Sequence, residues 1–380
     1  MKKFRKIYIV AITIFICGCS SNYKPPTPAS LTSFQPTLQV KQEWSKGLTE
    51  GAKEQNLKLT PVINNNRIYV NSYNGDIVAV DALHGKKIWA INTKLNLTSG
   101  LSFGSGMIFA GSEDGQITAI REQDGKVSWL NILGGEIIAT PTVAGKIILV
   151  KAKNGDLNAF NVDTGKFLWA YNREVPSLVL KGDSSAKVSN NLVAAGFSSG
   201  ELVILDLNSG RLLWRQVIAE GHGSFPVENM VDIDADPQIV DGIVYAVTYQ
   251  GRIVAIEIKT GHVLWDHEMS AISGLSVDAK LVYVSDIQGY IWSFDRKTGN
   301  IVWKQEALLN HNVTGTTLIG NNLIVGDAQG YVHFMSKDDG HFVARLNISK
   351  DDAIIAAPLV VDKTVYIYTQ KGNLAKLVVG

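Results

Sequence analysis

The densest group of side chains that could do chemistry in this sequence is the acidic run from Asp232 to Asp236, with an aspartate at every second position. Alternating carboxylates also begin a calcium-binding loop, but such a loop needs glycine at its sixth position and glutamate at its twelfth. Pro237 and Ile243 stand there instead. The seven histidines are spread along the chain without a His-x-x-x-His pair, and no Cys-x-x-Cys pair occurs. The sequence therefore predicts no metal site.

Composition and charge limit the classes of partner. The chain has 380 residues, of which 46% are hydrophobic and 19% are charged. This much apolar material can bury a large core, so we expect a folded globular protein. Residues 1–18 hold four basic side chains and no acidic one, and the remainder has 32 basic against 35 acidic side chains, a net charge of −3. A nearly neutral body argues against nucleic acid as a partner.

The first 18 residues have the pattern of an export signal. A basic segment at residues 2–6 precedes the apolar run Ile7–Ile16. This run is shorter than the roughly 20 residues that span a bilayer, but it suits the core of a signal peptide. We therefore predict that residues 1–18 are a signal peptide and that the chain is exported.

The segment Ile16–Cys19 resembles the lipobox of bacterial lipoproteins, in which a small residue directly precedes the lipidated cysteine. Cys19 fits the pattern, whereas Cys17 follows the bulky Ile16. The resemblance implies a lipid anchor on Cys19, and Ser20 after it implies sorting to the outer membrane, with the protein facing the periplasm. The alternative is an ordinary secretory leader with Cys19 as an incidental thiol. Residues 19–38, rich in Ser, Pro and Thr, are predicted to be the lipidated N-terminus and a flexible tether.

Side chains beyond the tether are positioned by a repeat of about 42 residues. One glycine recurs eight times, at Gly75, Gly115, Gly155, Gly200, Gly251, Gly289, Gly330 and Gly372. Ten residues later a second glycine follows in seven repeats, at Gly85, Gly125, Gly165, Gly210, Gly261, Gly299 and Gly340. Four residues further on, six repeats have tryptophan, at Trp89, Trp129, Trp169, Trp214, Trp265 and Trp303, and the seventh has Ala344. Two fixed offsets held through seven copies indicate eight structural repeats.

Each repeat is interpreted as β-strands separated by tight turns. In the first repeat, the β-rich runs Arg67–Ser72, Ile77–Val80 and Lys87–Ile91 are separated by turns at Gly75 and Gly85. The positions two and five residues after the first glycine are apolar in all eight repeats, so the middle run is buried on both faces. A fourth run, such as Leu59–Ile63, precedes each unit. Four antiparallel strands with neighbours on both faces describe one blade of a β-propeller.

The two ends of the chain supply the last blade. The eighth repeat stops after its third strand, near Val379, and an unassigned strand, Gln39–Ser45, carries Trp44 at the start of the body. Pairing the two removes an exposed sheet edge. The sequence thus predicts an all-β fold, an eight-bladed β-propeller of four-stranded antiparallel blades over residues 39–380, with the ring closed by the N-terminal strand.

Two family resemblances follow from these motifs. The segment Thr164–Trp169 resembles the tryptophan-docking repeat of the quinoprotein (PQQ) dehydrogenases, which are also eight-bladed and exported. The lipobox and nearly the whole mature chain resemble the BamB family, propeller lipoproteins of the outer-membrane β-barrel assembly machinery (BAM complex). Three stretches carry the second resemblance: Val175–Gly182, Asp232–Pro237 and Gly326–Phe334.

Repeat lengths point to a binding face. The gap from a tryptophan to the next repeat's glycine is 26 residues after Trp89 and after Trp129, but 31 after Trp169 and 37 after Trp214. Two consecutive blades therefore carry insertions, and insertions on one face of a repeat fold often form its binding surface.

The BamB resemblance implies contacts to the core subunit at Leu178, Leu180, Lys181, Asp232 and Asp234, which fall in these insertions. We expect an exposed apolar centre with charges around it. Lys181 stands where the family often has arginine, so bidentate geometry is lost. Two alternatives stay open: the leucines pack inside the fourth blade, or the aspartates cap turns.

Two function classes remain. The first is a non-enzymatic scaffold, without cofactor or metal, that binds the core barrel subunit of the assembly machinery through its periplasmic POTRA domains. It would aid folding and insertion of outer-membrane proteins, with their unfolded precursors as a second expected partner. The alternative is a PQQ-dependent periplasmic dehydrogenase. That family's cofactor site includes adjacent cysteines, and the mature chain has only Cys19. The sequence therefore favours the scaffold.

Overall fold

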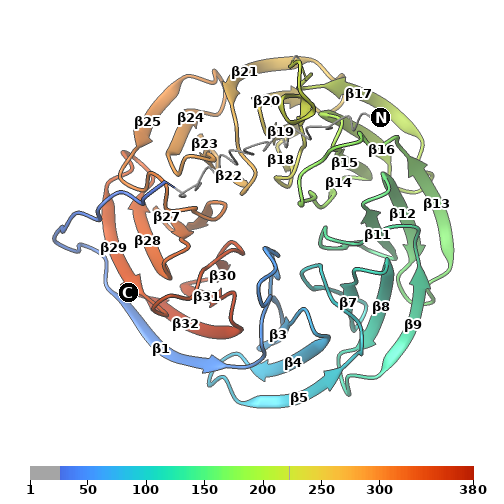
Figure 1. Ribbon diagram of the computed structural model, residues 1–380, viewed down its shortest axis with the longest axis horizontal. Coiled ribbons are helices and arrows are strands. Elements are labelled where there is room, and N and C mark those ends of the chain that lie inside the picture. Colours follow the sequence, from blue (N-terminus) through green and yellow to red (C-terminus); the bar gives the residue numbers. More distant parts are fainter. Residues whose placement is uncertain (1–25, 222) are drawn as a thin grey trace, which may run out of the picture.

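The computed structural model describes residues 26–221 and 223–380, so the predicted signal peptide and Cys19 lie outside the described residues. The described chain forms 32 β-strands and one short 3-10 helix. The strands build eight four-stranded antiparallel sheets around a central axis (Figure 1). This confirms the predicted all-β, eight-bladed propeller. In these residues no helix is long and apolar enough to cross a bilayer.

Seven blades each use four consecutive strands, numbered here from the axis outwards. Blades one to three comprise β2 (Val62–Asn64), β3 (Arg67–Asn71), β4 (Asp76–Asp81), β5 (Lys87–Asn92); β6 (Ser102–Gly104), β7 (Met107–Gly111), β8 (Gln116–Arg121), β9 (Val127–Ile132); and β10 (Thr142–Ala144), β11 (Ile147–Ala152), β12 (Asp156–Asn161), β13 (Phe167–Asn172).

Blades four and five follow the same order, and the 3-10 helix η1 (Pro226–Asn229) lies between them. They comprise β14 (Lys187–Ser189), β15 (Leu192–Gly196), β16 (Glu201–Asp206), β17 (Leu212–Val217); and β18 (Gln238–Val240), β19 (Ile243–Val247), β20 (Gly251–Glu257), β21 (Val263–Met269).

Blades six to eight complete the ring. They comprise β22 (Leu275–Val277), β23 (Leu281–Ser285), β24 (Ile291–Asp295), β25 (Ile301–Gln305); β26 (Thr317–Ile319), β27 (Asn322–Gly326), β28 (Tyr331–Ser336), β29 (Phe342–Asn347); and β30 (Leu359–Val361), β31 (Thr364–Tyr368), β32 (Asn373–Val379), β1 (Val40–Gly47).

The burial of each strand follows its place in the blade. In blade one, Ile77 and Val80 of β4 are fully buried, as the apolar offsets predict, whereas β5 exposes alternate side chains to solvent. The β3–β4 hairpin turns at Gly75, whose φ is +93°, and an added Cβ there would lie 2.6 Å from the Leu95 carbonyl oxygen. Only glycine fits this turn, which explains why the residue recurs. The innermost strands are only three residues long, shorter than the predicted runs.

Tryptophan joins neighbouring blades. Trp89 Nε1 donates a 3.0 Å hydrogen bond to the Glu122 carbonyl in blade two, and its ring lies against Gly125, where a Cβ would approach the indole to 3.2 Å. Seven interfaces share this bond, which runs from the outermost strand of one blade to a carbonyl of the next. The pairs are Trp44–Leu83, Trp89–Glu122, Trp129–Val162, Trp169–Leu207, Trp214–Ile258, Trp265–Arg296 and Trp303–Lys337.

Ring closure is as predicted. Strand β1 pairs antiparallel with β32, from Val40 opposite Val379 to Gly47 opposite Asn373, and adds the fourth strand to blade eight (Figure 1). A bulge between Gln42 and Trp44 interrupts the register. The strand begins one residue and ends two residues later than the predicted Gln39–Ser45.

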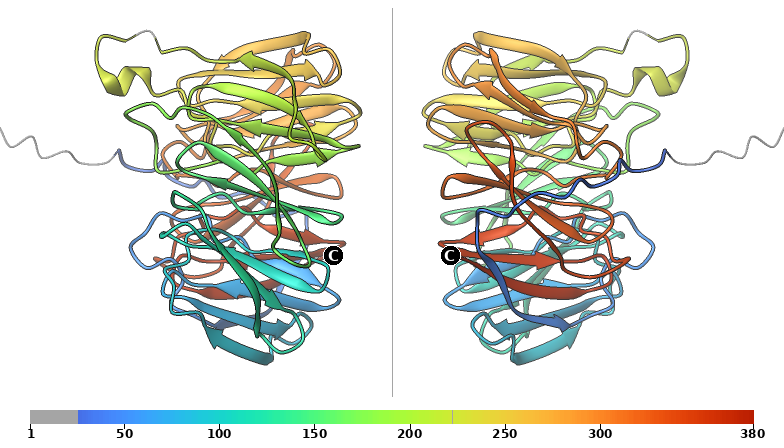
Figure 2. Two further views of the ribbon diagram at one scale, coloured as in Figure 1. Left: turned by 90° about the vertical axis from the view of Figure 1, so that its right-hand side faces the viewer. Right: turned by 90° about the vertical axis from the view of Figure 1, so that its left-hand side faces the viewer.

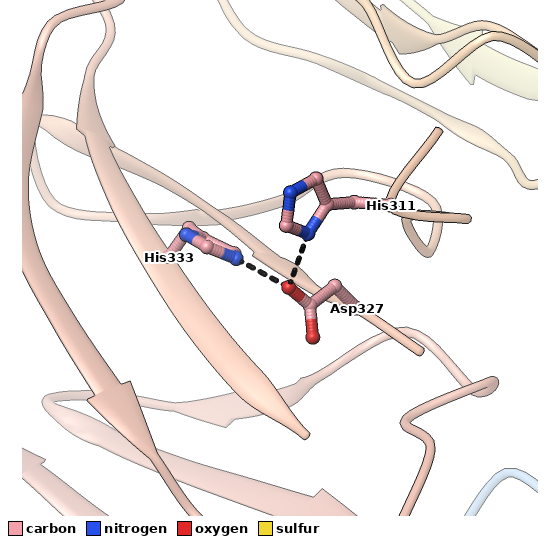
Figure 3. Close-up of side chains that lie close together, drawn as sticks. All are labelled: His311, Asp327 and His333. Atoms are coloured by element: carbon pink, nitrogen blue, oxygen red, sulfur yellow. Dashed lines mark hydrogen bonds and ion pairs between the residues drawn. The ribbon is translucent and has the colours of Figure 1, made fainter. Parts of the chain in front are cut away.

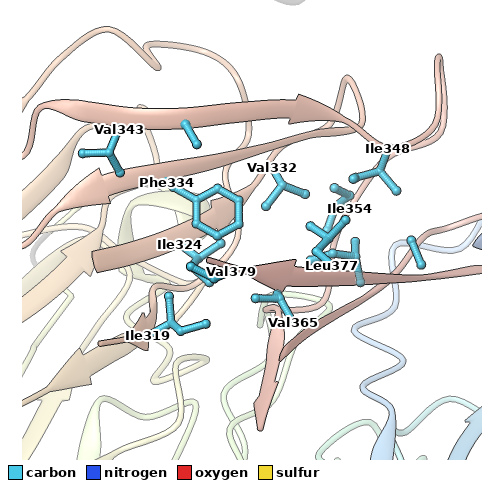
Figure 4. Packing of buried hydrophobic residues seen from close by; sticks show 13 residues of the cluster. Ile319, Ile324, Val332, Phe334, Val343, Ile348, Ile354, Val365, Leu377 and Val379 are labelled. Carbon is cyan, nitrogen blue, oxygen red and sulfur yellow. The ribbon is translucent and has the colours of Figure 1, made fainter. Parts of the chain in front are cut away.

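The interface between blades seven and eight, here called the seam, has no tryptophan. Ala344 stands at the tryptophan position of blade seven, and blade eight has no turn joining its last two strands because they come from opposite ends of the chain. Aliphatic side chains and Phe334 fill the seam instead (Figure 4). Leu38 and Val40, from the N-terminal segment, pack against this cluster.

Residues 26–39, here called the strap, lie extended along blade seven. The amides of Thr37 and Leu38 donate to the Val343 carbonyl at 3.0 and 3.1 Å, and the Ala29 amide donates to the Leu309 carbonyl at 2.9 Å. Within the predicted flexible tether, residues 19–38, the described part is therefore docked. Many of its contacts use the backbone, which a composition of Ser, Pro and Thr does not reveal.

Candidate partner-binding surface

The two predicted insertions connect the outermost strand of one blade to the innermost strand of the next. The first insertion, residues 173–186, joins β13 to β14, and the second insertion, residues 218–237, joins β17 to β18. Figure 2 shows both on one side of the ring, where the second insertion projects with η1 at its tip. They lie side by side, because hydrogen bonds connect them directly.

The aspartates of the second insertion hold the first insertion in place. Asp232 Oδ1 accepts a hydrogen bond from the Leu180 amide at 3.2 Å, and Asp236 Oδ1 accepts one from the Ser185 amide at 2.7 Å. Between them Asp234 faces Gly182, where an added Cβ would lie 2.5 Å from the carboxylate. The alternating acids thus form a clamp along a neighbouring loop.

This arrangement corrects one expectation. Asp232 and Asp234 are not exposed charges around an apolar centre: their exposed fractions are 0% and 5%. They are enclosed because both insertions leave the ring at adjacent blades and pack on each other. The open alternative, in which the aspartates cap turns, does not describe this bond of Asp232, because the amide that it accepts belongs to the neighbouring insertion.

A central cavity of about 290 Å³ opens on the same face, lined by loops that precede seven of the eight innermost strands. Asp234 and Lys58 line it with Lys181 and Asp236. Burial raises the pKa of Asp234 to about 7, since no side chain or amide of the described chain donates to it. Lys58 Nζ donates to the Ile272 carbonyl at 2.6 Å.

A buried ion pair fixes the first insertion from the other side. Lys151, on β11 of blade three, donates to the carboxylate of Asp183 and to the Gly196 carbonyl. Both charged side chains are more than nine-tenths buried. Removal of either partner would leave an uncompensated charge, so the pair holds the loop firmly.

The predicted contact residues of the first insertion reach the surface. Leu178 is 43% exposed and belongs to no core cluster, so the alternative that it packs inside blade four is wrong for this residue. Leu180 is half-buried and Lys181 is exposed. Lys181 Nζ donates to Gln55 Oε1 across the cavity mouth. The surface therefore consists of one exposed leucine, a half-buried leucine and a cation on a fixed loop.

Sequence reasoning did not single out two apolar residues of the second insertion. Phe225 and Val227 are 66% and 52% exposed at η1. Asn229 closes this tip by donating to the Gly223 and Phe225 carbonyls, at 3.1 Å each. An aromatic residue in the longest insertion, flanked by glycines and proline, was the available signal.

A second polar cluster lies on blade seven, away from the insertions. His311, Asp327 and His333 are buried, and one ligand atom from each lies within 4.8 Å of the others (Figure 3). Arg345 Nε donates to His333 Nδ1 at 3.1 Å, so the neutral ring carries its proton on Nε2, which points at Asp327. A metal-bound histidine normally donates through its other nitrogen. The hydrogen bonds therefore favour a proton-ordered cluster over a metal centre.

Comparisons with known proteins agree with this architecture. A family model described as "Outer membrane protein assembly factor BamB" matches residues 73–305. A relative of the same name from Shewanella oneidensis is 30% identical over 95% of this chain and 94% of its own length. One from Vibrio cholerae is 30% identical over the full length of both chains. The chain belongs to the BamB family.

Solved structures show the same fold. The crystal structure of BamB from Moraxella catarrhalis has a TM-score of 0.82 at 22% identity, covering 90% of this chain and all of that one. The quinohemoprotein alcohol dehydrogenase from Comamonas testosteroni has a TM-score of 0.70 at 14% identity, covering 89% of this chain and 76% of that one. The BamB family and these dehydrogenases thus share a propeller scaffold.

No tryptophan lines the central cavity of this BamB-family chain. Seven of the eight tryptophans lie between blades. The eighth, Trp292, is on β24 and donates to Asp286.

Two Gly-x-Ser-x-Gly runs occur: residues 100–104 lead into and include β6, and residues 196–200 connect β15 to β16. The strand-to-helix elbow that activates such a serine is therefore not formed at either run.

Proposed function

We propose that this chain is a non-enzymatic lipoprotein of the outer-membrane protein assembly machinery, anchored through Cys19 on the periplasmic side. It binds the core barrel subunit through its POTRA domains and so aids folding and insertion of outer-membrane proteins. Membership in the BamB family supports the assembly role. The observation that carries the binding surface is an exposed Leu178 on an insertion held from both sides by buried charges.

The structure supports different roles for different residues of this surface. Leu178, Leu180 and Lys181 contact the partner, and Phe225 extends the apolar area. Asp232 acts as a positioning residue through the Leu180 amide. Asp234 lies at the cavity mouth, where a cationic group of the partner would stabilise its carboxylate. A preorganised loop loses little conformational entropy on binding, which favours affinity.

The test is copurification of the core subunit with leucine variants of the full-length protein. Leu178→Ala together with Leu180→Ala should weaken binding by about 2 kcal/mol or more, because truncation of central apolar anchors has this effect. Leu264→Ala is the matched control, since Leu264 is 45% exposed on β21, outside the insertions. Normal copurification of a folded double variant would refute the surface.

Asp232 variants separate positioning from charge. Asp232→Asn keeps an oxygen acceptor for the Leu180 amide, so binding should be largely retained, whereas Asp232→Ala should release the loop and weaken binding. Equal losses of binding in both variants would instead show that the negative charge of Asp232, rather than its hydrogen bond to the Leu180 amide, supports binding. Thermal melts of each variant show whether the ring is intact.

The anchor has a separate test. Cys19→Ala should leave soluble periplasmic protein, because each buried methylene of an acyl chain contributes about 0.8 kcal/mol to membrane binding. Cys17→Ala is the control and should still be anchored. Recovery of the Cys19 variant with outer membranes would contradict the proposed lipidation.

A further inference from the structure

Blade seven holds the strap with side chains that no other part of the proposed function uses. Arg345 Nη1 donates to the Thr32 carbonyl at 2.9 Å, and His311 Nε2 lies 2.8 Å from the Ala29 carbonyl. Asn310 donates to the Thr27 carbonyl at 3.1 Å. Phe34 stacks on Phe342 with ring centroids 5.7 Å apart. The strap thus occupies a built site with polar and aromatic contacts along its length.

The positions of the protons around Asp327 follow from its neighbours. Its Oδ1 accepts from the amides of Gln329 and Tyr331, at 2.9 and 2.8 Å. Its Oδ2 faces His333 Nε2 at 2.8 Å and His311 Nδ1 at 3.0 Å (Figure 3). Four donors saturate an ionised carboxylate, and accordingly the hydrogen bonds from both histidines outweigh burial and lower the pKa of Asp327 to about 2.

His311 is placed between two acceptors. Its Nδ1 faces the Asp327 carboxylate and its Nε2 faces the Ala29 carbonyl. Neither oxygen can donate, so both nitrogens carry a proton when both bonds form, and the ring is an imidazolium ion. A neutral His311 would point one lone pair at an oxygen in a buried site.

We propose that the strap is a releasable latch, docked on blade seven when His311 is protonated and released when that proton is lost. When the strap is released, a neutral His311 still donates from Nδ1 to Asp327, and its Nε2 accepts from water. The neutral ring then no longer faces the Ala29 carbonyl with a lone pair. The strap competes for the same proton through the Ala29 carbonyl. Docking and protonation therefore stabilise each other.

The groups that face this ring set the direction of the pH effect. Asp327 and Gln329 come from the turn after β27, His333 from β28, and Ala29 from the strap, while Arg345 of β29 donates to His333 and Thr32 rather than to His311. Burial opposes the charge on His311, but the bonds to Asp327 and Ala29 outweigh it and raise its pKa above 6.5. The latch is therefore closed below pH 6.5 and opens as the pH rises through the raised pKa.

Release would change how far the propeller reaches from its anchor, a consequence that rests on the proposed lipidation of Cys19. Eight residues separate Cys19 from Thr27, the first strap residue held, and 21 separate it from Val40. At about 3.5 Å per extended residue, the maximum span grows from about 28 Å to about 74 Å. The docked strap also ends on the face that carries the insertions (Figure 2).

Hydrogen exchange of the full chain, followed by mass spectrometry, tests the latch at pH 5.5 and pH 8.5. Protection factors, which correct for the intrinsic rate, are compared for residues 27–39 and for β20 as an internal reference. We expect strap protection to fall about tenfold or more at the higher pH, as loss of one charged hydrogen bond implies. Protection of β20 should not change.

Variants connect this effect to His311. His311→Gln should lower strap protection at pH 5.5 and abolish its pH dependence. The control, His341→Gln, changes an exposed histidine of the same blade whose only side-chain partner is Asp339, among the described residues. Phe34→Ala should release the strap at both pH values without disturbing the ring.

Two results would overturn the latch: pH dependence that persists in His311→Gln, or strap protection unaffected by that variant. Because exchange is measured independently of membrane attachment, the latch and the Cys19 anchor fail or succeed separately.

Discussion

Adjacent blades are packed together in one way at seven interfaces of the ring and in another way at the seam. At the seven interfaces a tryptophan spans the gap and donates to a carbonyl of the next blade, as Trp265 does to Arg296 at 2.9 Å. At the seam, Ala344 leaves the space to aliphatic side chains (Figure 4). Backbone amides of the strap donate to the Val343 carbonyl.

The difference teaches what tryptophan docking requires. The carbonyl that accepts the indole proton lies in or beside the turn between the third and fourth strands of the next blade, and the second glycine makes room for the ring. Blade eight has no such turn, because its outer strand is β1. A tryptophan in blade seven would find neither the carbonyl nor the glycine, so its absence follows from the way the ring closes.

The largest effect should come from removing the closing strand. Deletion of residues 20–45 takes away the strap, Trp44 and most of β1, and exposes β32 as an edge. The free energy of unfolding should fall by at least as much as in one buried Trp→Ala change, about 3 to 5 kcal/mol. Urea or thermal unfolding measures this loss. Deletion of residues 20–35, which spares Leu38 and β1, is the control. An unchanged melt would make β1 a peripheral strand.

A single tryptophan interface should contribute slightly less. Trp265→Ala should destabilise the ring by about 3 to 5 kcal/mol, since the indole is only 7% exposed and its removal leaves a cavity. Trp265→Phe keeps most of the ring volume and should cost about 1 kcal/mol through the lost hydrogen bond. Similar melts for both variants would contradict the cavity explanation.

The reverse substitution at the seam should not help. Ala344 is buried among Phe334 and Val343, so Ala344→Trp should overpack the seam and destabilise the protein by about 1 to 3 kcal/mol. Chemical denaturation provides the measurement, with Ala344→Val as a smaller step in the same direction. Stabilisation by tryptophan would mean that the seam can accept an indole after all.

The smallest expected effect is a pH dependence of blade seven, on the face of β28 that points away from the seam. Burial lowers the pKa of His333, so stability decreases as the pH falls below 6.5 and the unfolded chain takes up the proton. The raised pKa of His311 has the opposite sign, and its contribution is lost above pH 6.5.

Hydrogen-exchange protection of β28 should therefore be greatest near pH 6.5. Protection of β20, at a tryptophan interface, should vary less with pH. Equal pH profiles for β28 and β20 would show that the two histidines do not make blade seven more sensitive to pH.

Most of the fold is written locally, which is why it could be predicted from the sequence. The turn at Gly75 needs a positive φ, and this recurs at the first glycine of every blade except blade five, where Gly251 is the exception. The lack of a side chain at Gly125 makes room for Trp89, and this recurs at all seven tryptophan interfaces. The eighth repeat ends after its third strand, so the sequence also indicated that blade eight takes its fourth strand from the N-terminal segment that carries Trp44. The insertions were found in the same way, as departures from a constant spacing.

Features that depend on contacts between distant segments were not predictable. His311 and His333 are 22 residues apart and meet only because a turn and a strand of blade seven converge on Asp327. Whether Asp232 is buried or exposed depends on how the two insertions pack on each other, and a sequence pattern does not encode that packing. The docked strap was missed because its polar composition is typical of linkers.

The pairing of β1 with β32 has a consequence for the order of events in synthesis. Val40 is among the first residues of the propeller to be made, and its partner Val379 is next to last in the chain. Closure must therefore wait until β32 has been synthesised, and its entropic cost grows with the logarithm of the loop length. Until then β1 is an unpaired strand, and Lys41, Glu43 and Lys46 protect it from aggregation, as charges on edge strands do. A chain truncated before Asn373 would lack β32, the strand with which β1 pairs to close the ring.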